Sequence, residues 1–177
     1  MKKIINNNKA WFTLNHIVLI TTILVIPAMW LYISLQNKQD NEFCVNNWVN
    51  YVKAMQLNSM FKNDIKDYLF NSSNSRIIEY QYKKWKNFDN KTANQFYDRS
   101  EGYCIVNFWG NIMSIKYKEL KNFVSNNSEE EISLMIKEAY SKLDRFKNNM
   151  LSTPKEDRIY LMWLSNNELE IIQNENQ

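Results

Sequence analysis

An uncharged apolar stretch near the N-terminus constrains this chain more than any other feature. Residues 17–35, IVLITTILVIPAMWLYISL, carry no charged side chain over nineteen positions. A helix rises about 1.5 Å per residue, so this stretch would extend about 28 Å, close to the hydrocarbon thickness of a bilayer. Trp30 and Tyr32 suit the headgroup level at its far end, and membrane helices tolerate a proline such as Pro27. We therefore expect residues 17–35 to cross a membrane once.

The charges on either side of this stretch predict its orientation. Lys2, Lys3 and Lys9 precede it without any acidic residue, whereas Asp40 and Glu42 follow it. The positive-inside rule then places the N-terminus in the cytoplasm, so we expect a single-pass protein of a bacterial inner membrane with a periplasmic C-terminal domain. The predicted domains are a cytoplasmic tail at 1–16, a transmembrane helix at 17–35 and a periplasmic domain at 36–177.

Two other readings of the N-terminus stay open. A cleavable signal peptide shares the basic leader and the apolar core, but residues 33–39 offer no small-x-small cleavage site. A pilin-like leader is the second, because Ala10 precedes the sequence WFTL. The acidic residue that such proteins place early in the apolar helix is absent, and Asn15 and His16 stand there instead.

The two cysteines, Cys44 and Cys104, are sixty positions apart. If both lie outside the cytoplasm, a disulfide between them would persist. It would join the membrane-proximal helix to a strand pair and would stabilise the domain by roughly 4 kcal/mol on the chain-entropy model. The alternative is two unpaired buried thiols that act as small apolar side chains. Two cysteines without a nearby histidine do not complete a zinc site, so we expect no metal there.

The exported part is predicted to combine helices with antiparallel strands. Apolar spacing predicts one long or two short helices over residues 42–70, with a slip near Asn58 and Ser59. Gly110 and Asn111 suggest a type II′ hairpin turn. Strands are predicted where apolar side chains recur at every second position, or where an apolar run is rich in residues that favour strands. They are expected at residues 76–83, 93–99, 103–108, 112–118, 158–164 and 168–172.

A helix is predicted to begin at Ser128. Ser128 and Glu131 form a capping box, and three glutamates occupy the favourable first turn. Thr153 and Pro154 are expected to end this helix before the last strands. The resulting fold class is α+β: a transmembrane helix, then a small antiparallel calycin-like sheet or partial barrel with helices packed against it.

The residue inventory argues against catalysis and against nucleic acid binding. His16, the only histidine, would lie at the inner membrane face, which excludes Ser-His-Asp and Cys-His sites in the exported domain. Two glycines do not build a phosphate loop. The net charge of +3 comes from interspersed basic and acidic residues without a basic stripe. Four carboxylates could come together on a sheet as a catalytic pair, but we expect them to be solvent-exposed residues of strands and turns. They are Glu79, Asp89, Asp98 and Glu101.

Aromatic residues crowd the segment from about 80 to 117. Most of them would fill the core of a small sheet, but a curled sheet lined in this way could also enclose an apolar ligand. No cofactor is expected. The residues predicted to line this pocket or core are Tyr80, Tyr82, Phe96, Tyr103, Ile105, Met113, Ile115, Tyr117 and Trp163.

The order of these features resembles the ToxS-like proteins, a group that includes VtrC-like, PsaF-like and MyfF-like members. The resemblance rests on the membrane helix ending in Trp30-Leu31-Tyr32, the step Glu101-Gly102-Tyr103, the sequence KELKNF at 118–123, the capped helix and the closing sequence YLMWLSNNELEII at 160–172. It implies a non-catalytic, calycin-like periplasmic domain that pairs with a ToxR-like transmembrane transcription regulator. Some members form with that partner a barrel that binds bile salts. The two cysteines are not a general feature of the family.

These features predict an accessory protein that stabilises or activates such a regulator, with an exposed sheet edge at 76–86 or 168–172 as the contact. It would sense a small apolar ligand, such as a bile salt, or pH. A phage T-type holin is the competing reading, because it also combines a short tail, one membrane helix and an exported disulfide-containing domain. A minor pilin is a third reading and an enzyme the last.

Overall fold

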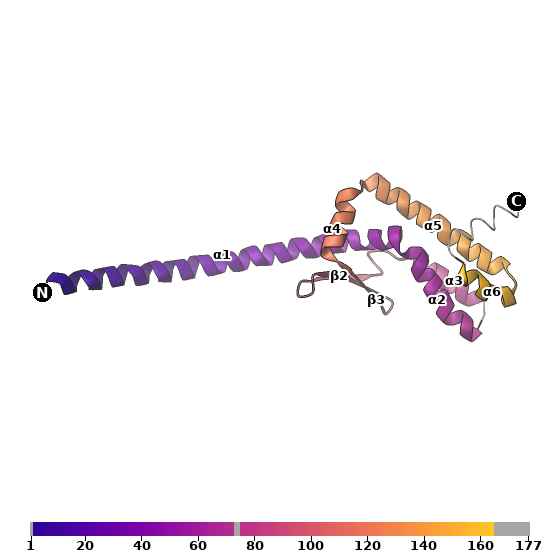
Figure 1. Cartoon of the computed structure of the whole chain (residues 1–177), viewed down its shortest axis with the longest axis horizontal. Coiled ribbons are helices and arrows are strands. Elements are labelled where there is room, and N and C mark those ends of the chain that lie inside the picture. Colours follow the sequence, from indigo (N-terminus) through magenta and orange to yellow (C-terminus); the bar gives the residue numbers. More distant parts are fainter. Residues whose placement is uncertain (1, 73–74, 165–177) are drawn as a thin grey trace. The chain divides into compact units, whose positions relative to one another are not determined.

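The computed structural model describes residues 2–72 and 75–164, which form six α-helices and a three-stranded antiparallel sheet (Figure 1). The fold class is therefore α+β. The chain divides into two compact units, Met1–Phe43 and Cys44–Gln177. The predicted strand at 168–172 lies outside the described residues.

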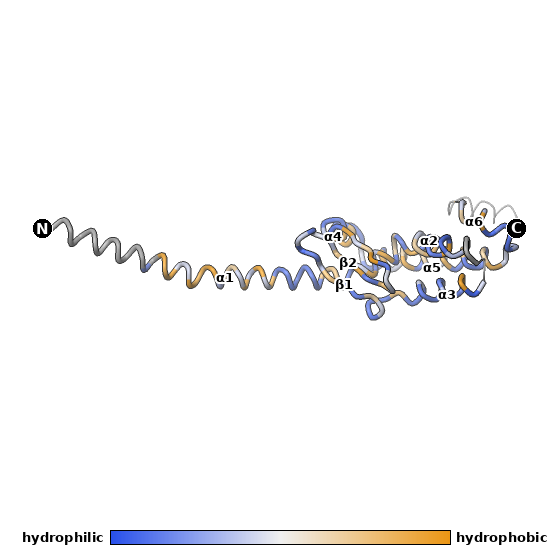
Figure 2. The backbone as a smooth tube through the Cα atoms, turned by 90° about the horizontal axis from the view of Figure 1, so that it is seen from below, coloured by the Kyte–Doolittle hydropathy of each residue, from blue (hydrophilic) through white to orange (hydrophobic). Residues whose placement is uncertain are grey.

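The first unit is helical throughout its described part. Helix α1 spans Lys2–Met55 without interruption and includes Pro27. Its apolar stretch appears largely orange in Figure 2, and the polar residues that follow appear blue. The helix is long and apolar enough to cross a membrane, and none of its most apolar window is buried. Core helices of soluble proteins and signal sequences pass the same test of length and composition, but a core helix would be mostly buried.

Helices of the second unit pack around one apolar core. The last turns of α1 lead through Gln56 into α2 (Leu57–Ser72), so the predicted slip occurs two residues earlier than expected. Helices α2, α3 (Ser75–Lys86) and α5 (Glu129–Ser152) contact one another. Phe61 of α2 meets Phe146 of α5 edge to face, with ring centroids 5.8 Å apart. Fully buried side chains from these elements form the core. They include Trp48, Val52, Phe61, Ile65, Ile78, Trp85, Leu143 and Met150.

Residues 76–83 were predicted as a strand, and this prediction was wrong. They belong to α3, Ser75–Lys86. The buried residues of this helix are Ile78, Gln81 and Trp85, which are three and four positions apart as on one helix face. Lysines occupy its last turn, where their positive charges interact favourably with the negative end of the helix dipole.

The sheet follows α3 in the order β1 (Asn94–Asp98), β2 (Tyr103–Phe108), β3 (Asn111–Lys116), and each strand pairs with the next one along the chain. These strands confirm the predicted ones at 93–99, 103–108 and 112–118 within one or two residues at each end. Phe108 pairs with Asn111, so the turn is centred on Trp109 and Gly110 and not on Gly110 and Asn111. Both central residues have positive φ, 52° and 81°, as in a type I′ turn and not the expected type II′ turn.

The elements that follow the sheet within the described residues are helical. Helix α4 (Tyr117–Asn126) starts directly after β3. Helix α5 begins with the predicted capping box: Ser128 accepts from the backbone N–H of Glu131, and the Glu131 carboxylate accepts from that of Ser128. It ends at Thr153, as expected. After the short 3₁₀ helix Lys155–Asp157, residues Arg158–Trp163 form α6, so the predicted strand at 158–164 was wrong.

Candidate functional site

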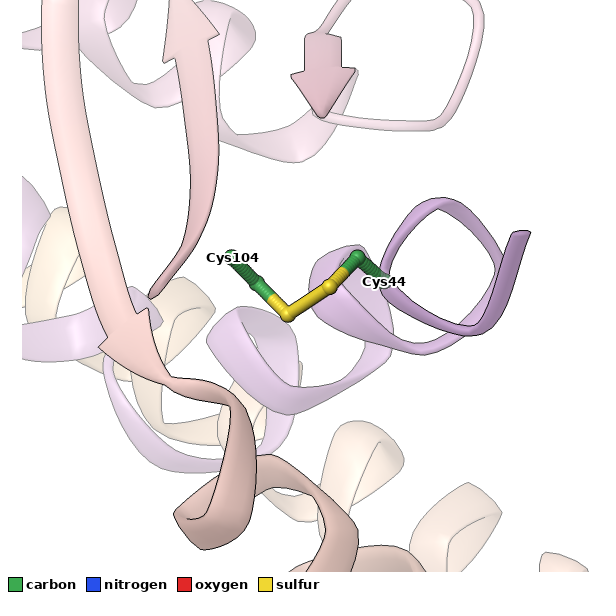
Figure 3. Close-up of a disulfide and its surroundings, with 2 residues drawn as sticks. All are labelled: Cys44 and Cys104. Carbon is green, nitrogen blue, oxygen red and sulfur yellow. A yellow bond between two sulfur atoms is a disulfide. The ribbon is translucent and has the colours of Figure 1, made fainter. Parts of the chain in front are cut away.

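A disulfide fixes the sheet to the end of the long helix. Cys44 of α1 and Cys104 of β2 are bonded, with their Cα atoms 5.5 Å apart (Figure 3). Both residues are 0% exposed. The structure therefore confirms the predicted pair, and it contains no free cysteine among the described residues. The bond orients the sheet, because one face of β2 must point toward α1.

The two faces of the sheet differ in their surroundings. Side chains alternate along each strand, and residues that pair across strands share a face. The face that includes Cys104 is the buried face. Its apolar members on β2 and β3 are Cys104, Val106, Phe108, Met113 and Ile115, all of them buried. Phe108 packs there on Phe88, with ring centroids 4.7 Å apart, and on Trp85 at 5.4 Å.

The opposite side, which we call the open face, also carries apolar residues. Phe96 of β1 pairs directly with Ile105 of β2, and Tyr103 and Ile112 lie on the same side. Phe96 is 44% exposed and Ile112 73% exposed, while Ile105 and Tyr103 are half-buried. The other residues of this face are polar, as a sheet side that faces water normally is. They are Asn94, Asp98, Asn107, Ser114 and Lys116. The exposed Phe96 and Ile112 depart from that pattern, and the open face is therefore a candidate contact surface.

Strand β1 is an outer strand of this sheet. Among the described strands it pairs with β2 alone. Of the two sheet edges predicted as contacts, residues 76–86 are helical, which excludes that edge, and residues 168–172 lie outside the described residues. The outer strands of the described sheet are β1 and β3, and we take β1 as the candidate edge because Phe96 lies at its centre.

The nine residues predicted to line an apolar pocket do not lie together. Met113 and Ile115 belong to the buried face, whereas Phe96, Tyr103 and Ile105 belong to the open face. The other four lie on helices, and three of them make ring contacts. Tyr80 meets Trp109 at 6.4 Å, Tyr82 meets Phe61 at 6.4 Å and Tyr117 meets Tyr97 at 5.0 Å. Trp163, on α6, is 70% exposed.

Tyr82 takes part in a polar cluster that the sequence did not indicate. Its hydroxyl donates to Asp144 of α5, and the Lys86 Nζ lies 2.9 Å from the same carboxylate oxygen. Burial and the bond to Asp144 raise the pKa of Tyr82. The hydroxyl of Tyr82 and the Asp144 carboxylate raise the pKa of Lys86. Burial opposes ionisation of Asp144, but the bonds from Tyr82 and Lys86 outweigh it and lower the pKa of that carboxyl.

This cluster joins α3 to α5 across sixty residues of sequence. A phenol with a raised pKa is a weaker acid at neutral pH, and the carboxylate already accepts from two donors. These properties suit an electrostatic link between helices better than proton transfer. No spacing signal could have revealed the pair, because Tyr82 and Asp144 lie on separate elements.

Two of the four carboxylates considered for catalysis, Asp89 and Asp98, have local structural partners. Asp89 accepts from the backbone N–H groups of Lys91 and Thr92 at 2.8 and 2.9 Å, which lowers its pKa. Asp98 accepts from the hydroxyl of Ser100 at 2.6 Å, which likewise lowers its pKa. Within residues 2–72 and 75–164, no group of three or more His, Cys, Asp or Glu side chains could hold a metal ion.

Two clefts are present on the helical side of the unit. The first, about 250 Å³, lies between the α1–α2 junction and α5. The second is a shallow groove of about 620 Å³ along α5, beside Lys86 and Tyr140. Neither is lined by any of the nine residues predicted for an apolar pocket.

Comparison with known proteins adds no relative: no family model, curated protein or solved structure matches this chain.

Proposed function

We propose that this protein is a membrane-anchored accessory protein that binds a protein partner through the open face and strand β1. The observation that carries this proposal is the exposure of two large apolar side chains on a sheet face whose other side is already packed on the core. Phe96 and Ile112 remain substantially in water. Because full burial of such a side chain stabilises by about 1.5–3 kcal/mol, covering what is still exposed would contribute roughly 1–2 kcal/mol each.

Strand β1 offers a sheet edge along which a partner strand could pair. Its five residues, Asn94–Asp98, pair with β2 on one side. An extended segment of a partner could pair on the other side, where main-chain hydrogen bonds give affinity and alternate side chains meet the open face. Phe96, at the centre of β1, would then be covered by the added strand.

The partner we propose is the exported domain of a ToxR-like transmembrane regulator, in keeping with the resemblance to ToxS-like proteins. The three strands would be extended at β1 by strands of that domain into a calycin-like sheet or barrel. An apolar ligand such as a bile salt would then bind in the shared interior. The protein acts by contact in this proposal and not by catalysis.

Three features support a location of the folded unit outside the cytoplasm. The apolar part of α1 is unburied and long enough to cross a membrane, the basic residues precede it, and the Cys44–Cys104 bond requires an oxidising compartment to persist. A periplasmic reporter fused to the C-terminus should therefore be active. Activity of a reporter that works only in the cytosol would contradict the proposal.

Partner binding is tested by co-purification from the native host. The full-length protein should retain a single-pass membrane regulator, and Phe96→Asp with Ile112→Asp should lose it. Ile159→Asp is the matched control, because Ile159 is also exposed but lies on α6. Deletion of the gene should lower the abundance of the regulator and the transcription of its targets. Unchanged capture by the double variant, or unchanged transcription after deletion, would overturn the proposal.

A pilin-like subunit is the second candidate, and the continuity of α1 favours it. One helix leads from the apolar stretch to Met55 without a break, as a subunit that assembles through its membrane helix would need. This candidate requires cleavage after Ala10, which mass spectrometry of the purified protein would detect. The T-type holin reading requires membrane permeabilisation and cell death on expression, whereas the accessory-protein proposal requires neither cleavage nor toxicity.

A further inference from the structure

The cleft at the α1–α2 junction is lined by both charged and apolar side chains. It is enclosed by the start of α2 and by one face of α5. Leu57 and Ala139, both buried, belong to its apolar part, together with Met135. Methionine is flexible and polarisable, so the wall can adapt to ligands of slightly different shape.

Two opposite charges lie on the α5 wall of the cleft. Glu138 and Lys142 are four positions apart, and residues at that spacing are neighbours on a helix surface. Neither side chain has an ion pair or a hydrogen bond to another residue in the part of the chain that the structure describes. An ammonium group and a carboxylate of one ligand could meet both.

Asn58 contributes to the cleft a hydrogen-bond acceptor that has no donor. It is part of the cleft wall, and its Oδ1 atom is buried without any hydrogen-bond partner. The backbone of the junction does not need it, because Gln56 N donates to Val52 O at 2.9 Å and Met60 N donates to Gln56 O at 3.0 Å. Because this atom has almost no solvent-accessible surface, a ligand N–H would reach it only if a side chain of the cleft moves, and the bond would then satisfy an acceptor that otherwise has no partner.

We propose that this cleft binds a free amino acid with an apolar side chain, held by its ammonium and carboxylate groups. The ammonium would donate to Glu138 and Asn58, the carboxylate would accept from Lys142, and the side chain would contact Leu57, Met135 and Ala139. The volume of about 250 Å³ lies just below the usual ligand-pocket range of roughly 300–1,000 Å³, which suits a molecule of this size.

The proposal is independent of the sheet contact and is tested by calorimetric titration of the full-length protein in detergent micelles. The probes are leucine, N-acetylleucine and leucinamide, which separate the two charges of the ligand. Leucine should bind saturably. Each modified probe lacks one charge-assisted bond, worth about 1.5–3 kcal/mol, and should bind about 10- to 100-fold more weakly.

Variants link the binding to these residues. Glu138→Gln and Lys142→Met should each weaken leucine binding about ten-fold or more, whereas Glu130→Gln and Lys137→Met, on the same helix outside this cleft, should not. Ala139→Leu should abolish binding by filling the cleft. If Ala139→Leu does not fold, the two exposed wall variants still decide the question. No saturable leucine binding at millimolar concentrations, or equal binding of all three probes, would overturn the proposal.

Discussion

The disulfide is expected to contribute a measurable part of the unfolding free energy. Cys44 and Cys104 are 60 positions apart, so their bond closes a long loop in the unfolded chain. The chain-entropy model gives a loss of roughly 4 kcal/mol of unfolding free energy when that loop is opened. Small domains have a total of about 5–15 kcal/mol, so the loss would be a large part of the whole.

The perturbation is the double substitution Cys44→Ala and Cys104→Ala, compared with the oxidised protein by urea unfolding in micelles. With a slope of about 1.5 kcal/mol per molar urea, the midpoint should fall by about 2.5 M. The slope itself should rise, because the unfolded chain without its crosslink exposes more surface.

A second comparison separates the crosslink from the packing of the two sulfur atoms. The reduced protein keeps both buried side chains and lacks only the bond. It should show most of the destabilisation of the double variant. A loss of unfolding free energy below about 1 kcal/mol in both proteins would show that the bond constrains neither the unfolded chain nor the sheet.

Three further predictions concern single residues. Ser128→Ala removes the side-chain acceptor of the capping box and should lower the unfolding free energy by about 1 kcal/mol, measured by thermal unfolding. Asp144→Asn should destabilise the protein at neutral pH, because the bonds from Tyr82 and Lys86 depress the pKa of Asp144 in the folded state. Since that contribution is lost as pH falls through the depressed pKa, the difference from the parent protein should begin to shrink near about pH 4, the ordinary pKa of an aspartate, and should vanish only below the depressed pKa of Asp144. A constant difference would contradict the assignment. Gly110→Ala should cost about 1–2 kcal/mol through its φ of +81° alone, since no atom lies within 4 Å of the added Cβ.

Local signals in the sequence predicted several elements correctly. Strand β2 is found at residues 103–108 as predicted, and α5 begins with its capping box at Ser128. Both depend on side-chain alternation or on hydrogen bonds between close neighbours. The disulfide could be predicted as well, because only one pairing is available to two cysteines.

Helix α3 shows why the period-two pattern failed. Ile78, Tyr80 and Tyr82 alternate with polar residues, but Tyr80 is exposed in the helix and Gln81 is 3% exposed. The buried face of the helix consists of Ile78, Gln81 and Trp85. Because Gln81 is polar, a search for regularly spaced apolar residues does not detect this helical spacing. Tertiary packing decided between two patterns that the same residues satisfy.

The last predicted strand failed for a related reason. Residues 158–164 are almost continuously apolar, so they carry no period that separates a strand from a short helix. The hairpin turn shifted by one residue because Trp109 adopts a positive φ, a conformation that bulky residues rarely take. The open face and the cleft at the α1–α2 junction depend on contacts between distant segments, and no local pattern contains that information.

The most direct test of the central claim is a photo-activatable crosslinker in place of Phe96, in cells of the native host. We expect a crosslink from position 96 to the exported domain of a single-pass membrane regulator, and none from the same group at position 159. The absence of a crosslink at position 96 in a protein that is folded and membrane-inserted, or an equal crosslink from both positions, would contradict it.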